Sequence, residues 1–318
     1  MKISTLSLIA AVGLASSMHS YKKKNTSNAV SGNAAAKAYV APGKYDEFYN
    51  FVSGGFSGQM SVYGLPSGRL FRYIPVFSVD PEKGWGYNEE TKPMLNTSHG
   101  FVPWDDLHHI ELSQTKGEQN GKWVFANANN TPRLARIDLK TFRTVEILEL
   151  PNSGGNHSSP FGTENSEYIV AGTRFSVPGD SDNGDVPINT YKQNFKGHIS
   201  FVSVASETGE MKIAFQLRTP GVNFDLARAG KGKSHGWFFF SCYNTEQAST
   251  LLEVNASQRD KDFIMAVNWK KAEEYIKAGQ GKKTTVKYAH NVFNESTQTA
   301  SSTIEKEVLV LDIEEFKD

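Results

Sequence analysis

The sequence predicts an all-β fold of the β-propeller type, and three observations support this. Short runs with alternating, β-branched or aromatic residues recur between turn clusters from residue 44 onward. Aromatic residues make up 12% of the chain and 27 residues are glycine, which suits twisted sheets joined by tight turns. The runs group into units of roughly 40–50 residues, the length of a four-stranded propeller blade. A β-sandwich is the alternative fold.

The first segment, residues 1–20, has one lysine, an apolar run and then small residues, as in a secretory signal peptide. The apolar run is too short to span a bilayer. Residues 21–43 are rich in Lys, Asn, Ser and Ala and predict a flexible linker. We therefore expect a secreted, soluble product whose folded domain occupies residues 44–318.

Two predicted blade units are the clearest part of this domain. The first comprises strands over residues 122–126, 134–138 and 144–148, and the second comprises strands over residues 168–171, 198–204 and 211–217. Further strands are predicted over residues 59–63, 71–77, 237–240, 263–268 and 308–312. Only residues 270–278 have a helical pattern.

Charge and cysteine content exclude several classes of function. The formal net charge is zero, so neither nucleic acid nor an anionic membrane is an expected partner. With Cys242 as the single cysteine, the chain has no internal disulfide, zinc ribbon or iron–sulfur cluster. Any metal must therefore be held by histidines, carboxylates or carbonyls. Residues 232–236 match a hydrolase nucleophile motif in letters, but an aromatic strand rather than a helix follows them.

The adjacent pair His108-His109, two residues after Asp106, is the main candidate for a metal site. Neighbouring residues on a regular strand point to opposite faces, so both rings can share a site only near a loop or around a polynuclear centre. His157 lies in a turn-rich segment between the two predicted blades, and loops at one end of a propeller converge. Imidazole ligands suit copper, zinc or iron. A surface or packing role for these histidines is the alternative.

Several motifs together resemble the nitrous-oxide reductase family from about residue 43 to the end. They are residues 43–69, Arg72-Tyr-Ile-Pro-Val-Phe77, Gly84-Trp-Gly86, Asp106-Leu-His-His109 and Cys242-Tyr-Asn-Thr-Glu246. The signal segment has no twin-arginine pair, as in the general-secretion branch of that family. The resemblance implies a periplasmic enzyme that reduces nitrous oxide to dinitrogen in denitrification.

The resemblance also implies cofactors and their ligands. His108, His109 and His157 match ligands of a sulfide-bridged four-copper cluster, and Asp106 and Asp225 match carboxylates that orient the ligand rings. A structural calcium ion is implied as well, held by oxygen ligands of Tyr243, Glu246, Val254 and Asp260.

The chain stops at Asp318, where family members continue into further blades of a seven-bladed propeller. The other cluster histidines and the cupredoxin domain with its dicopper centre lie beyond that point in the family. We therefore expect an N-terminal portion, an incomplete propeller that is inactive alone. The resemblance implies a cytochrome c or small copper protein as electron donor and a homodimer. A secreted, non-catalytic propeller that serves as a binding or scaffold module is the alternative.

Overall fold

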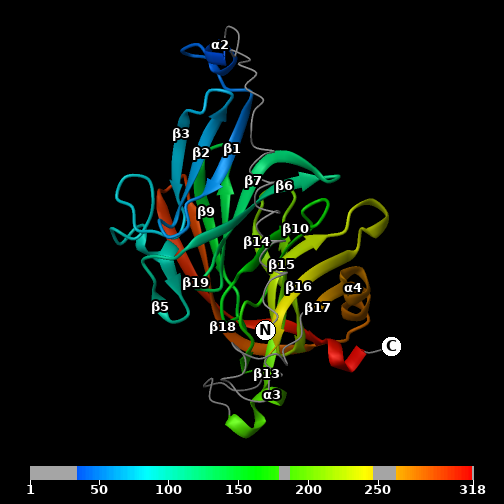
Figure 1. The fold of residues 1–318 in the computed structure, drawn as a ribbon. Coiled ribbons are helices and arrows are strands. Elements are labelled where there is room, and N and C mark those ends of the chain that lie inside the picture. The colour runs from blue at the N-terminus through cyan, green and yellow to red at the C-terminus, as the bar shows by residue number, and fades with distance from the viewer. Residues whose placement is uncertain (1–33, 179–186, 246–262, 317–318) are drawn as a thin grey trace, which may run out of the picture. The chain divides into compact units, whose positions relative to one another are not determined.

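The computed structural model describes residues 34–178, 187–245 and 263–316 (Figure 1). The predicted all-β fold of the propeller type is confirmed, because successive antiparallel sheets make up most of these residues. The helices are short and are named here with the 3-10 turns: α2 (Ala34–Ala38), α3 (Tyr191–Asn194), α4 (Trp269–Lys277), η1 (Lys92–Leu95), η2 (Ile188–Thr190), η3 (Gly232–Ser234) and η4 (Ile313–Phe316). None of the helices in the described ranges combines the length and apolar character that crossing a bilayer requires.

The chain divides into two compact units, Met1–Tyr49 with Gly64–Arg69, and Asn50–Tyr63 with Leu70–Asp318. In the first unit, the Asp46 carboxylate accepts a hydrogen bond from the Ser67 backbone N–H at 2.9 Å and pairs with Arg69 at 3.1 Å. Two small sheets precede the blades, with strands β1 (Phe48–Ser53), β2 (Gln59–Leu65), β3 (Leu70–Pro75), β4 (Asn96–Thr97) and β5 (Gly100–Phe101). The candidate site described below lies wholly in the second unit.

The first blade is an antiparallel meander of four strands: β6 (Leu107–Thr115), β7 (Glu118–Ala128), β8 (Arg133–Asp138) and β9 (Arg143–Glu149). It contains the three strands predicted over residues 122–148 and adds β6 in front of them. Lys116 and Gly117 join β6 to β7, and both have positive φ (54° and 76°). Two consecutive positive φ values make the turn whose twist matches a β-hairpin.

The second blade repeats this order with β10 (Ser158–Gly162), β11 (Tyr168–Gly172), β13 (Phe195–Val204) and β14 (Met211–Pro220), while β12 (Val177–Pro178) pairs with β13. A third sheet follows with β15 (Val222–Ala229), β16 (Trp237–Thr245) and β17 (Phe263–Asn268). Helix α4 begins directly after β17, where the Asn268 side chain accepts a hydrogen bond from the Lys271 N–H at 3.0 Å. The predicted helix is thus confirmed.

The first strands of these three sheets, β6, β10 and β15, lie side by side. Buried apolar side chains fill the space between the sheets: one cluster joins the first two blades around Phe125, Leu134 and Val202, and the other joins the second blade to the third sheet around Phe201, Phe224 and Phe240. Neighbouring first strands are the feature of a propeller that brings one end of each blade to a common centre.

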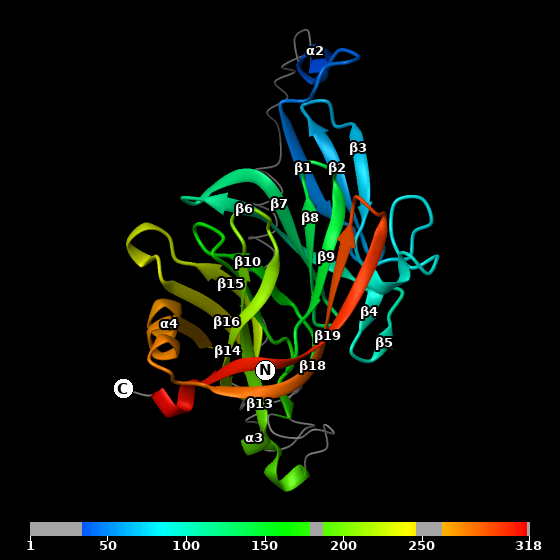
Figure 2. The same ribbon diagram turned by 180° about the vertical axis from the view of Figure 1, so that it is seen from behind.

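A long hairpin, β18 (Lys282–Asn294) and β19 (Thr299–Asp312), joins the outer strands of the two blades (Figures 1 and 2). β18 pairs antiparallel with β9, and β19 pairs parallel with β14. The sequence predicted a strand over residues 308–312 but not this pairing. Its physical basis is that β9 and β14 would otherwise present unpaired backbone groups.

Candidate metal centre

A bulge at the start of β6 places the two adjacent histidines. Leu107 pairs with Ala128 and Ile110 with Ala126, so His108 and His109 stand together opposite the single residue Asn127. The extra residue breaks the regular alternation of side chains and increases the local twist. The sequence predicted that the pair lies at the loop end of a strand, and the pair occupies the second and third positions of β6. The sequence did not predict the bulge, which brings both rings to one site.

Asn127 fills the opening of this bulge and is fully buried. Its Oδ1 accepts a hydrogen bond from the His109 backbone N–H, which the bulge leaves without a strand partner. Its Nδ2 donates to the backbone carbonyl of Asn156, the residue before His157. The sequence reasoning missed Asn127. The one signal was a polar residue directly after a buried apolar run, over residues 123–126, and that signal is weak.

His157 lies in the connection from β9 to β10, as predicted. This connection is held at several points by the first blade: the Asn156 side chain donates to the Arg133 carbonyl at 3.2 Å, and the Asn156 N–H approaches the Asn129 carbonyl at 3.4 Å. Glycine is needed at position 154, because a Cβ there would lie 2.7 Å from the Phe175 backbone oxygen. The segment is therefore packed closely enough to hold the His157 ring in place.

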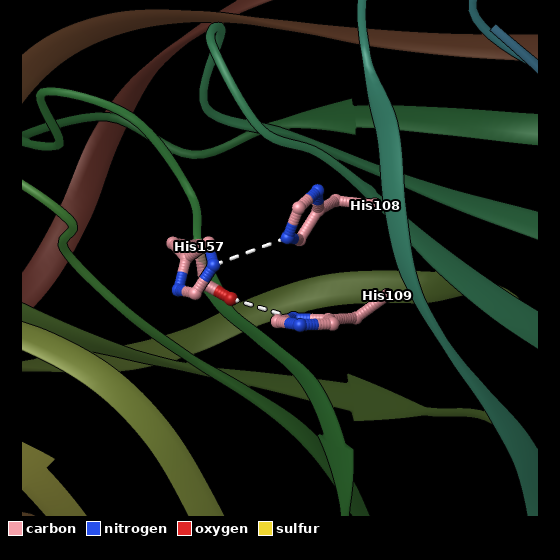
Figure 3. A group of neighbouring side chains, drawn as sticks. All are labelled: His108, His109 and His157. Atoms are coloured by element: carbon pink, nitrogen blue, oxygen red, sulfur yellow. Dashed lines mark hydrogen bonds between the residues drawn. The ribbon is translucent and has the colours of Figure 1, made fainter. Parts of the chain in front are cut away.

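The three imidazole rings face one another (Figure 3), with centroids 4.6–4.8 Å apart. One nitrogen of each ring lies within 4.8 Å of the others. The Nδ1 of His109 lies 2.9 Å from the His157 carbonyl oxygen. Because a carbonyl oxygen only accepts, His109 carries its proton on Nδ1 and keeps a lone pair on Nε2.

Two carboxylates stand behind the other two rings. The Nδ1 of His108 lies 3.3 Å from Asp106, and the Nδ1 of His157 lies 2.9 Å from Asp225, which is on β15. The His157 contact is not aligned as a hydrogen bond. Asp106 is itself held by the Asn129 side chain at 2.9 Å. The carboxylates favour a proton on Nδ1 of both rings and so leave both Nε2 atoms with lone pairs.

The Nε2 atoms of His108 and His157 are 3.1 Å apart. Two lone pairs at this distance repel each other unless a proton or a metal ion lies between or beside them. Burial lowers the pKa of His109, and the nearby His108 lowers it further. Burial also lowers the pKa of His157, although Asp225 opposes this. Protonation is therefore disfavoured, and neutral imidazole is the form that binds metal.

The structure thus brings together all five residues predicted around the copper site: His108, His109, His157, Asp106 and Asp225. Asp225 lies in a second bulge, because Phe224 pairs with Cys242 and Ala227 with Phe240. Most of the predicted calcium ligands are not among the residues that the structure describes. The backbone of Tyr243 belongs to β16, but Glu246, Val254 and Asp260 lie outside the described residues.

Sequence comparisons identify relatives of the chain. No family model matches it. Over 259 residues, 79% of this chain, it is 32% identical to the nitrous-oxide reductase of Pseudomonas fluorescens. Over 246 residues, 76% of this chain, it is 30% identical to that of Stutzerimonas stutzeri. The chain is related to the nitrous-oxide reductases. The family resemblance predicted from its motifs is confirmed, and the chain spans 38% and 36% of the length of these two reductases.

The TM-scores and sequence identities with solved structures are low. Hydrazine synthase of Kuenenia stuttgartiensis overlaps 80% of each chain with a TM-score of 0.34 and 12% identity. A β-propeller domain from Myceliophteria thermophila overlaps 62% of this chain and 56% of its own, with a TM-score of 0.27 and 7% identity.

Proposed function

We propose that His108, His109 and His157 are ligands of the catalytic copper centre of a periplasmic nitrous-oxide reductase. This enzyme reduces nitrous oxide to dinitrogen and water with two electrons and two protons. The observation that carries the proposal is the meeting of the His108 and His157 Nε2 atoms at 3.1 Å, with an acceptor group at each ring's Nδ1. Such acceptors fix the tautomer and raise the basicity of metal-binding imidazoles.

The donor set fits copper, because neutral imidazoles bind it strongly and copper heads the affinity order of divalent metals. When bound, the family's four-copper sulfide cluster would coordinate nitrous oxide and supply its electrons. The chain's own residues would hold the rings in a fixed geometry. Asp106 and Asp225 would keep the protons of His108 and His157 on Nδ1, and the His157 carbonyl would do the same for His109.

The remaining parts of the enzyme are also proposals. We propose that further cluster ligands and a cupredoxin domain with a dicopper centre belong to a longer product. That product would take electrons from a cytochrome c or small copper protein and act as a homodimer. A calcium ion would be held by Tyr243, Glu246, Val254 and Asp260, whose oxygens suit a hard cation. Residues 1–20 would direct secretion.

The proposal is tested by replacing His109 in the native gene, so that the protein is made at its natural length. We expect His109→Ala to abolish nitrous-oxide consumption by whole cells, measured by gas chromatography, and to lower the copper content of the purified protein. His235→Ala is the matched control, since His235 is a half-buried histidine that faces Glu164 and Glu167 instead of other histidines. We expect the control to retain activity and copper.

Unchanged nitrous-oxide consumption in the His109→Ala strain, with the protein present at normal level, would overturn the proposed function. The non-catalytic module would then be the better explanation. A loss of activity in both variants would show that His109 has no role distinct from that of His235 and would also count against the proposal.

A further inference from the structure

We propose that Asn127 is a positioning residue for the three-histidine centre. It ties the strand that carries His108 and His109 to the segment that carries His157, and so sets the separation of the three rings. The inference deepens the proposed function and rests on it, because the rings are the proposed copper ligands. Asn127 itself has no role in the family resemblance described above.

The first step of the argument is the bulge in β6. Two residues of β6 stand opposite one residue of β7, so the His109 N–H has no backbone acceptor across the strand pair. A buried N–H without a partner destabilises the folded chain. The Asn127 Oδ1 accepts this hydrogen bond from within the bulge. It therefore stabilises the local backbone shape that turns both rings to one site.

The second step is the other end of the same amide. The Asn127 Nδ2 donates to the Asn156 carbonyl, one residue before His157. The partners also fix the orientation of the amide, since its oxygen must face the N–H and its nitrogen must face the carbonyl. One short, fully buried side chain thus spans two segments that are 47 residues apart in sequence, counted from His109 to Asn156.

The bulge that carries Asp225 shows that the unpaired backbone groups of a bulge can be satisfied without an asparagine. There, Ser241 on β16 accepts a hydrogen bond from the Leu226 N–H at 3.0 Å and donates to the Leu226 carbonyl at 3.2 Å. Both bonds of that hydroxyl stay within one strand pair. Asn127 differs because its second bond crosses to a third segment. A side chain that only satisfied the backbone of the bulge would not need this hydrogen bond to the Asn156 carbonyl.

The first test uses the metal-free chain and reads the protonation site of His109. In the native chain, ring ¹⁵N shifts should show the proton on Nδ1, held by the His157 carbonyl at 2.9 Å. We expect Asn127→Leu, which removes both amide bonds at similar volume, to release this contact and move the proton toward Nε2. Asn127→Asp keeps the acceptor for the His109 N–H and loses only the donor to Asn156, so we expect a partial change.

Asn291→Leu is the matched control for folding. Asn291 is buried and its Nδ2 donates to two backbone carbonyls, of Met94 at 3.0 Å and Asn96 at 2.8 Å, on other parts of the fold. We expect this variant to lose stability in thermal unfolding while the His109 proton stays on Nδ1. An unchanged His109 signal in both Asn127 variants would overturn the inference, and so would the same change in Asn291→Leu.

The second test uses copper alone. The native chain, loaded with Cu(II), should show nitrogen couplings from three imidazoles in electron paramagnetic resonance, and Asn127→Leu should show fewer. Competition with a chromophoric chelator should show copper affinity about 10–100-fold weaker in Asn127→Leu, with Asn127→Asp in between. If the native chain shows no histidine nitrogens on copper, the proposed function fails, whereas the proton position of His109 still decides the role of Asn127. Equal copper affinity in all variants would overturn the positioning role.

Discussion

The central histidines and two peripheral histidines, His235 and His290, differ in what their ring nitrogens contact. Each central ring has an acceptor beside Nδ1 and turns its other side to the shared site. In His290, Nε2 itself contacts the buried Glu146 carboxylate at 2.6 Å. In His235, Nδ1 and Nε2 face Glu164 and Glu167 at 3.3 and 3.4 Å.

This difference shows that burial alone does not distinguish a ligand from a structural histidine. The side chain of His157 is 19% exposed and that of His290 is 17% exposed, so their solvent access is nearly the same. The distinguishing feature is whether Nε2 is left for a ligand or already occupied by a carboxylate. Substitutions at the two kinds of histidine would therefore have different effects.

Replacing Glu146, whose carboxylate contacts His290, should lower stability and leave metal binding unchanged. Glu146 is fully buried and also contacts the Arg136 Nε at 2.8 Å and the Met211 N–H at 2.9 Å. Glu146→Ala leaves Arg136 buried without its partner, so we expect the free energy of unfolding to fall by about 3–5 kcal/mol. Urea denaturation measures this.

Glu118→Ala is the control, because Glu118 is exposed on β7, and a change within about 0.5 kcal/mol is expected. Copper affinity of folded Glu146→Ala should equal that of the native chain. If Glu146→Ala instead weakened copper binding without loss of stability, the contrast between central and peripheral histidines would be wrong.

Neutralising the two carboxylates behind the central rings should weaken copper binding. We expect Asp106→Asn and Asp225→Asn to lower copper affinity by about 10–100-fold, because each removes the charge that favours the Nδ1 proton. Asp106 should have the larger effect, since its side chain is 5% exposed and that of Asp225 is 37% exposed, where water screens the charge. Chelator competition measures both. A larger loss of copper affinity in Asp225→Asn than in Asp106→Asn would contradict the importance of burial.

The stability of the metal-free chain should depend on pH through His109. Burial lowers the pKa of this histidine below its usual value of 6.5, so the unfolded chain binds a proton where the folded chain does not. Stability should therefore fall as the pH drops from 6.5 toward the folded pKa, and it should be unaffected at higher pH. His109→Gln should flatten this dependence in urea denaturation at a series of pH values. An equally steep dependence in that variant would exclude His109 as its source.

The sequence predicted most strands of the two blade units and named the five residues that the structure brings together around the three histidines, because these depend on local alternation and on recognisable motifs. It did not predict the two bulges or the role of Asn127. A bulge depends on how two strands pair, and one inserted residue leaves little trace in hydrophobic pattern. The hairpin was missed for a related reason: only residues 308–312 of β19 were predicted as a strand and β18 was not predicted, and their partners β9 and β14 are set by long-range packing.

The hairpin also bears on the order in which the chain can fold. Within the first blade, partners such as Arg136 and Glu146 are 10 residues apart, whereas the Ala289 N–H reaches the Glu149 carboxylate across 140 residues. Loop-closure entropy makes such distant contacts slow to form. During synthesis, both blades emerge from the ribosome before residues 282–312 exist. The outer edges of the blades, β9 and β14, therefore stay unpaired until the hairpin has been made.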